Sequence, residues 1–191
     1  LSVTWAVLIM GAITFVYTAA GGFVAVLMTD VIQFAVLMAM ILIMVPLSFG
    51  AVGGVGEFVS RAPEGFFSVV SDQYSWGWMI LWCLLNFFMI GGDWPFVQRY
   101  ISVPTPKDAR KSIYLVGALY LTTPFLWYIP TLAYRILNAE ANPEQAYMLM
   151  SQHILGAGMV GLMLAAMISA TLSMVSGTLN VFANVFTYDI F

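Results

Sequence analysis

Charged residues are scarce in this chain. Asp, Glu, Lys and Arg make up 8% of its 191 residues, whereas 62% of the residues are hydrophobic. A typical soluble domain has about 25% charged residues, so this deficit excludes that class. The apolar residues form long continuous runs rather than short alternating segments, which indicates membrane-spanning helices and not a barrel. The sequence therefore predicts an all-α integral membrane protein.

Cysteine and histidine are also nearly absent. The one cysteine, Cys83, lies inside an apolar run, and the one histidine is His153. This composition excludes a disulfide framework and a Cys/His metal site. The net charge is -3, and no basic patch suggests a nucleic-acid partner. No catalytic triad, phosphate-binding loop or paired carboxylates occur, so we predict no enzyme activity.

Long hydrophobic segments are what the chain does contain. About 20 apolar residues cross the hydrocarbon core of a bilayer. We expect about five transmembrane helices, at residues 1–20, 30–52, 76–95, 112–136 and 158–186. Gly21 and Gly22 favour a turn after the first helix. Thr29 is the expected N-cap of the second.

The third segment contains a strong helix-breaking pattern near its end. Gly91, Gly92, Asp93 and Pro95 predict a break at membrane depth. Freed backbone is tolerated there only where it lines a cavity or packs on protein, and transporters use such broken helices at substrate sites. Asn86 precedes the break by one to two turns. Its amide could bind a polar solute, or it could only hydrogen-bond a neighbouring helix.

Most of the positive charge lies in one short segment. Four of the six Lys and Arg residues fall within residues 99–111, and the positive-inside rule places this expected loop in the cytoplasm. Five crossings then put Asp30 and the C-terminal end on the same side. Asp30 begins a long uncharged helix, where a carboxylate is costly without water, a cation or a partner. It is either an ordinary interfacial residue or a waypoint for a small cation.

The last segment, residues 162–191, carries a stripe of small and polar side chains. At about 100° per residue these positions fall on one helix face roughly 120° wide. They are Ala166, Ser169, Ala170, Ser173, Gly177, Asn180, Asn184 and Thr187. The stripe serves either close helix packing or the presentation of oxygen ligands. Ser169 and Ser173 are one turn apart, so their hydroxyls can converge on one sodium ion.

Four stretches of the sequence resemble the solute:sodium symporter family in the family's own order. They are YTAAGGFVAVLMTDVIQ, DWPFVQRYISVPTPKDARKS, NPEQAYMLM with GMVGLMLAAMISATLSM, and FTYDIF. The resemblance implies a leucine-transporter-like fold of two inverted five-helix repeats. The chain would then be a central fragment that covers the end of the first repeat and much of the second.

The resemblance also implies a sodium site on the last helix. In one register the family's ligands fall on the Ala166 carbonyl, Ser169 and the position of Ala170, where many members have a second hydroxyl. In the other register they fall on Ala170, Ser173 and Met174. We expect Ser169 first and Ser173 second.

Further family positions concern ion passage and the solute. Asp30 matches an aspartate linked to sodium passage or to a second sodium site. Asn86 matches a substrate-contacting residue of the sugar carriers. Those carriers have Tyr-Trp where this chain has Met89 and Ile90, so a sugar substrate does not follow.

We therefore expect a secondary active transporter that couples inward sodium flow to uptake of a small polar solute by alternating access. Its partners would be the solute, sodium, the lipid bilayer and the remaining helices of the parent chain. It would reside in the plasma or inner membrane as a multi-pass protein. The alternatives are a symporter-like sensory or channel-like module without sodium coupling, and a helix bundle that only scaffolds partners.

Overall fold

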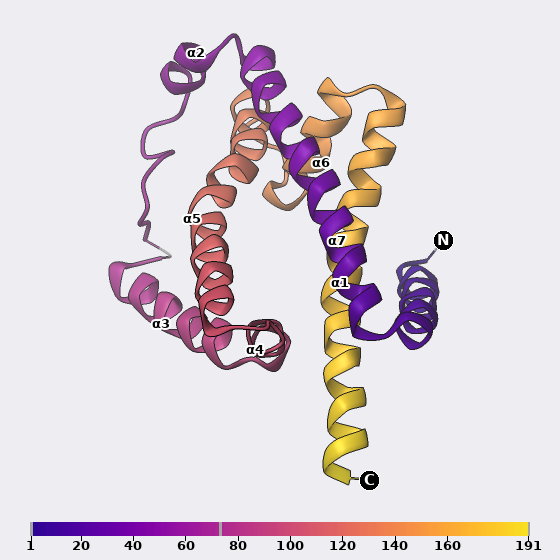
Figure 1. Ribbon diagram of the computed structural model, residues 1–191. Helices are drawn as coiled ribbons and strands as arrows, with labels where there is room; N and C mark the ends of the chain where they lie inside the picture. Colours follow the sequence, from indigo (N-terminus) through magenta and orange to yellow (C-terminus); the bar gives the residue numbers. More distant parts are fainter. Residues whose placement is uncertain (1, 73, 191) are drawn as a thin grey trace.

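The computed structural model describes residues 2–72 and 74–190, and within these residues every regular element is helical (Figure 1). The elements, in chain order, are α1 (Val3–Val52), α2 (Val55–Ser60), α3 (Trp76–Gly92), α4 (Trp94–Ile101), α5 (Pro106–Leu137), α6 (Pro143–Ile154), α7 (Ala157–Val185) and the π-helical turn η1 (Phe186–Ile190).

Helix α1 changes direction at Gly22. This residue has φ 60° and ψ -165°, a conformation that is essentially restricted to glycine. The predicted break after the first segment is thus confirmed. The predicted N-cap at Thr29 is wrong, because the helix resumes directly after Gly22 and Thr29 lies inside it. The Thr29 hydroxyl donates to the Val26 carbonyl at 2.8 Å. One glycine absorbs the whole change of direction, so no connecting loop or second cap is needed.

The break predicted in the third segment is present between α3 and α4. The two helices meet at 49°, with Asp93 as the hinge. The Asp93 amide closes α3 by donating to the Met89 carbonyl, and Pro95 falls in the first turn of α4, where a missing N–H costs little.

The basic segment differs from the expected loop. Arg99 belongs to the last turn of α4, and α5 already begins at Pro106. Thr105 caps α5 by accepting from the Asp108 amide at 3.3 Å. The irregular connection is therefore only residues 102–105, and Lys107 lies in the first turn of a long helix.

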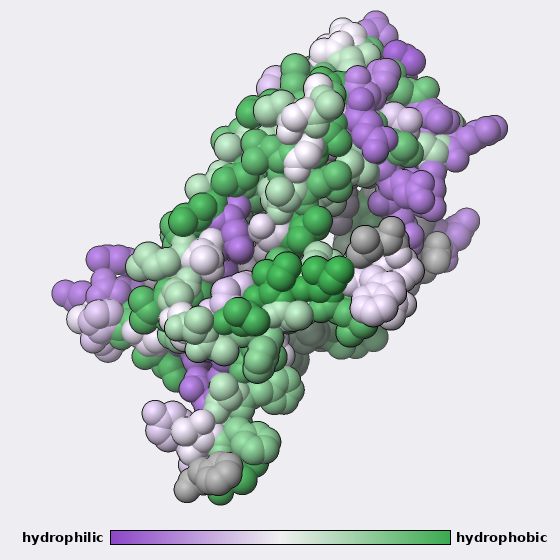
Figure 2. Space-filling view, turned by 90° about the vertical axis from the view of Figure 1, so that its right-hand side faces the viewer, coloured by the Kyte–Doolittle hydropathy of each residue, from purple (hydrophilic) through white to green (hydrophobic). Residues whose placement is uncertain are grey.

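Three helical stretches are long and apolar enough to cross a membrane, and the bent α3–α4 pair adds a fourth. They are Thr4–Val52, Pro106–Leu137 and Ala157–Ile190. The first of them is the 49-residue stretch that turns at Gly22. Figure 2 shows hydrophobic side chains over most of one face, with hydrophilic residues gathered mainly toward its margins. The all-α membrane fold is therefore confirmed.

The buried core joins the second half of α1 to α2, α5, α6 and α7. It contains Met40, Met44, Val52, Phe58, Ala133, Tyr147, Met150 and Met163. Helix α7 runs beside α1 (Figure 1), whereas α3 has no buried residue and packs principally on α4. The molecule thus has a packed α1–α7 side and an open α3 side.

Candidate functional site

The small-residue stripe of α7 faces the protein along part of its length. Ala166 and Gly177 are buried, and Ser169 and Ser173 are half-buried. Ala170 is exposed. The stripe therefore lies on the inward side of the helix, although its individual positions differ in depth.

Two buried polar residues complete this face. The Ser176 hydroxyl donates to the Ser173 carbonyl at 2.9 Å, and the Asn180 amide donates to the Ser176 carbonyl at 3.1 Å. Both side chains thus satisfy a donor within their own helix, which is a common solution for polar residues in apolar surroundings. Their oxygen atoms keep lone pairs that can accept from, or coordinate, a group on the inner face.

The carboxylate predicted as a cation waypoint has a cationic partner. Asp30 Oδ2 and Arg99 Nη2 are 2.7 Å apart, and the two side chains are 18% and 34% exposed, respectively. The other oxygen, Asp30 Oδ1, is buried and has no hydrogen-bond partner among the described residues. Asp30 therefore keeps a negative oxygen that the arginine does not use.

The ion pair lies against α7. A Cβ placed on Gly177 would stand 3.6 Å from Arg99 Nη2. A methyl group here would make an ordinary contact with the guanidinium, whereas a large side chain would displace it. The guanidinium of Arg99 therefore marks the point where α1, α4 and α7 meet.

Helix α1 contributes further buried oxygen atoms around its bend. Tyr17 Oη, Thr18 Oγ1 and Gln33 Oε1 are buried and have no partner among the described residues. Thr18 is only 8% exposed. Burying a polar oxygen without a hydrogen-bond partner costs free energy. We therefore expect water or a bound ligand next to this part of α1.

A pocket of about 450 Å³ opens beside this junction, and the same helices form it. Its lining includes Phe23 of α1, Trp94 and Gln98 of α4, Asn184 of α7 and Asp189 of η1. Gln98 adjoins Arg99 in sequence, and Asn184 is one turn beyond Asn180. The lining is mainly apolar, and Gln98, Ser102, Asn184 and Asp189 are its polar members.

The predicted solute residues lie elsewhere, on α3. The Asn86 amide donates to the Trp82 carbonyl at 2.8 Å, Met89 is 55% exposed, and Ile90 is half-buried. None of the three lines the 450 Å³ pocket. The structure therefore brings Asp30 and the α7 face into one region and leaves the α3 positions on the open side.

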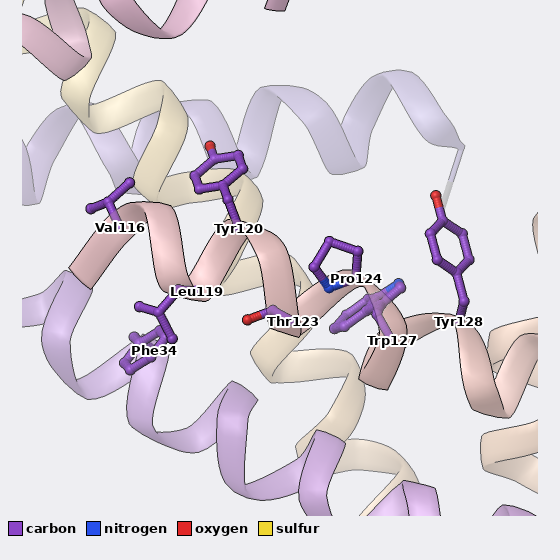
Figure 3. A pocket seen from close by; sticks show the side chains of 8 residues that line it. All are labelled: Phe34, Val116, Leu119, Tyr120, Thr123, Pro124, Trp127 and Tyr128. Atoms are coloured by element: carbon purple, nitrogen blue, oxygen red, sulfur yellow. The ribbon is translucent and has the colours of Figure 1, made fainter. Parts of the chain in front are cut away.

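A second pocket of about 510 Å³ lies between α1 and α5 and is mainly apolar. Its lining joins Phe34 of α1 to residues of α5, and Figure 3 shows Phe34 beside Leu119, with Pro124 and Trp127 further along α5. Thr123 contributes a polar oxygen. Such a lining matches no predicted site residue.

Sequence reasoning missed the role of Arg99, which it assigned to a cytoplasmic loop. The requirement that Asp30 needs a partner was recognised, and Arg99 is the first cation after the broken third segment. These two facts together could have suggested the pair. Ser176 lay outside the predicted stripe, and its burial depends on how α7 is rotated against the helices that pack on it, α1 and α4 among them.

Comparison with known proteins identifies the family. Residues 1–191 match the family model "Sodium:solute symporter family". The chain is 30% identical to the sodium/sialic acid symporter NanT of Aliivibrio fischeri, over 97% of this chain and 40% of that protein. It is 28% identical to the sodium/glucose cotransporter of Vibrio parahaemolyticus, over 98% of this chain and 40% of that protein. It is also 25% identical to mouse sodium/glucose cotransporter 1, over 100% of this chain and 36% of that protein.

The chain spans about 40% of the length of the first two relatives. Its match to the family model nevertheless runs from the first residue to the last. This multi-pass membrane chain belongs to the sodium:solute symporter family.

Proposed function

We propose that the parent protein of this chain is a secondary active transporter that couples inward sodium flow to uptake of a small polar solute by alternating access. The observation that carries the proposal is the family match over residues 1–191, together with relatives whose names specify sodium-coupled solutes. The broken α3–α4 pair supports it, because discontinuous helices form solute and ion sites in transporters.

Sodium is proposed to bind at the inward face of α7. Hard cations prefer oxygen ligands, and this face offers neutral hydroxyl and carbonyl oxygens. The Ala166 carbonyl with the Ser169 side chain forms one candidate set, and the Ser173 side chain belongs to the other. Both serines are half-buried, so either is accessible to an ion held between α7 and a further helix.

Asp30 is proposed as the cation waypoint on the cytoplasmic side. Its free Oδ1 oxygen supports this role, and the nearby 450 Å³ pocket, which is mainly apolar, adds a few amide and carboxylate side chains. The solute is proposed to bind at the open side of α3, where Asn86 supplies an amide and Met89 and Ile90 supply apolar contacts. The plasma or inner membrane is the proposed location, with the basic start of α5 and the C-terminal end in the cytoplasm.

The test uses the full-length parent protein in proteoliposomes. Labelled sugars, amino acids and carboxylates are offered under an inward sodium gradient, an inward proton gradient, or neither. We expect uptake that requires sodium and a loss of at least about tenfold in Ser169→Ala or Ser173→Ala, because removing one ligand weakens a small oxygen site. Asp30→Asn should slow turnover.

The matched control is Thr171→Ala, because Thr171 is an exposed hydroxyl on the same helix but off the stripe. Its uptake should stay near that of the unaltered protein. Uptake that ignores sodium, with both serine variants silent, would contradict the proposal and leave the stripe as a packing surface.

A further inference from the structure

Arg99 and a transported cation would compete for the same carboxylate. The guanidinium contacts Asp30 Oδ2 at 2.7 Å, in a half-buried position where water screens the pair only in part. A cation that arrives at Asp30 would meet Oδ1, the oxygen that Arg99 leaves free. Two positive charges on one carboxylate repel each other, so each weakens the binding of the other.

The position of Arg99 gives this competition a mechanical consequence. Arg99 lies in the last turn of α4, the shorter arm of the pair that bends by 49° at Asp93. Its guanidinium also reaches α7 at Gly177. The ion pair thus fastens the end of a hinged helix to the packed α1–α7 side of the molecule.

From these contacts we infer that Arg99 is a tethered cation that latches α4 onto Asp30, and that a sodium ion reaching Asp30 releases the latch. The inference rests on the proposed function, since it names how the cytoplasmic part of that cation path is regulated. In the latched state the Arg99 guanidinium of α4 lies against α7 at Gly177, the residue next to the buried Ser176. In the released state this part of α7 opens toward the 450 Å³ pocket, whose lining continues onto Gln98 and Asn184.

The latch couples sodium binding to the movement of α4 because the latched and released states differ in their affinity for sodium. Sodium binds the released state better than the latched state, because only there does Asp30 offer both oxygens. A ligand shifts an equilibrium only through such a difference in affinity. Without sodium the positive guanidinium neutralises Asp30 and keeps the path closed.

The test measures access to a buried reporter. Ser176→Cys is introduced into full-length protein that carries Cys83→Ser, because Ser176 is fully buried and the native Cys83 is exposed. The purified protein in proteoliposomes is treated with a water-soluble maleimide from both sides, in choline buffer or sodium buffer. We expect sodium to speed labelling about tenfold, within the usual range of coupling between two sites.

Removal of the latch should abolish this response. Arg99→Gln should label about ten times faster in choline than the reporter protein alone, and sodium should add no further increase. Arg99→Lys keeps the charge but replaces the guanidinium, whose Nη2 contacts Asp30, by a more strongly hydrated ammonium group, so it should label slowly in choline and open at a lower sodium concentration. The control is Arg110→Gln, which removes an exposed arginine at the start of α5 and should change neither rate.

The outcomes separate the latch from transport itself. Slow choline labelling in a well-folded Arg99→Gln protein, or labelling of the reporter protein that sodium does not change, overturns the latch. Folding is checked by the elution profile in detergent, and Arg99→Lys provides the result if Arg99→Gln aggregates. Absence of sodium-driven uptake in the unaltered protein contradicts the proposed function instead, because the choline labelling rates do not depend on transport.

Discussion

Ala170 is the residue at which this chain departs from the hydroxyl pattern expected of a sodium site. It neighbours Ser169 on the α7 stripe, and it is exposed where Ser169 is half-buried. A methyl group at this position offers no ligand, so any ion on the first candidate set has one oxygen fewer. The affinity for sodium should therefore be modest in this protein.

Ala170→Ser should strengthen sodium binding if the first register is correct. One added neutral oxygen ligand is worth about 1 kcal/mol, so the sodium concentration for half-maximal uptake should fall about fivefold. The measurement is sodium-dependent solute uptake by full-length protein in proteoliposomes. Ala165→Ser is the control, since Ala165 is exposed and lies off the stripe. An unchanged sodium dependence in Ala170→Ser would favour the register centred on Ser173.

Tyr147 in α6 should make the folded protein less stable at alkaline pH. Burial raises its pKa from 10.0 to about 12, and its ring stacks on Trp127 with centroids 4.5 Å apart. A raised pKa means that the folded state holds the phenolic proton more tightly than the unfolded state. This contribution to stability is complete below about pH 10 and is lost as the pH rises toward about 12.

Tyr147→Phe should remove this alkaline loss, because the stacked ring stays and the ionisable group is gone. The measurement is the thermal unfolding midpoint of the purified full-length protein between about pH 8 and about pH 11. The unaltered protein should lose stability over the upper part of this range more steeply than the variant. Tyr114→Phe is the control, since the Tyr114 side chain is 76% exposed. Parallel curves for Tyr147→Phe and the unaltered protein would count against a buried, neutral phenol.

The sequence identified a functional candidate only where one residue was unusual among its neighbours in the chain. Asp30 was predicted as an unusual carboxylate because its helix has no other charge, and this reasoning needs no tertiary information. Its partner Arg99 is 69 residues away in sequence, so only the need of Asp30 for a cation and the place of Arg99 after the broken segment could have pointed to the pair. Which α7 side chains are buried depends on how α7 rotates against α1, and periodicity fixes that rotation only to within one face.

At the scale of elements, the Gly22 bend decides how α1 is built. A Cβ at Gly21 would clash with the Ala25 Cβ, and Gly22 itself has φ 60°. The first glycine therefore permits a close approach, and the second supplies a backbone conformation that other residues adopt only with strain.

Gly22→Ala should destabilise the folded protein by about 1–3 kcal/mol, the usual cost of a strained backbone conformation. The measurement is the unfolding midpoint of the purified full-length protein in detergent. Gly11→Ala is the matched control on the same helix, because nothing lies within 4 Å of its added Cβ. That change should be neutral or stabilising by up to about 1 kcal/mol, from helix propensity. Equal effects of the two substitutions would show that the bend does not need glycine.

Element boundaries were predictable where glycine or proline set them. The breaks at Gly22 and Asp93 follow from local backbone chemistry. Thr29 was misassigned as a cap because threonine also hydrogen-bonds to its own helix, as its contact with the Val26 carbonyl shows. The basic segment was expected to be a loop from its charge, although Thr105 and Pro106 carry the cap and first-turn signals of a helix.

At the scale of the whole molecule, the open side needs partners. Helix α3 has no buried residue, and Phe87 and Phe88 are 72% and 71% exposed. In a membrane these rings face lipid or other helices. The relatives are about two and a half times longer than the matched region, given its 40% share of their length. The sequence of α3 does not determine what lies against these rings, because its apolar residues cover the whole helix rather than one face.

The proposed ion path and the latch both assume one orientation of the chain in the membrane. The proposal that the latch and the basic start of α5 face the cytoplasm depends on the positive-inside rule. If α1 crosses twice, at its two halves, the connection around Glu64 faces outward, Lys107 faces inward and Glu140 faces outward. All three residues are exposed, so each can carry a cysteine label without disturbing the core.

Glu64→Cys, Lys107→Cys and Glu140→Cys should therefore report opposite sides in alternation. Each is made separately in full-length protein with Cys83→Ser, because the exposed native cysteine would react as well. A membrane-impermeant maleimide should label the first and third in right-side-out vesicles and the second only in inverted vesicles. Permeabilised vesicles, in which all three must react, are the control. Labelling of Lys107→Cys and Glu140→Cys from one side would mean that α5 does not cross the bilayer. The latch at Asp30 would then lose its cytoplasmic assignment, because that assignment depends on the same crossings.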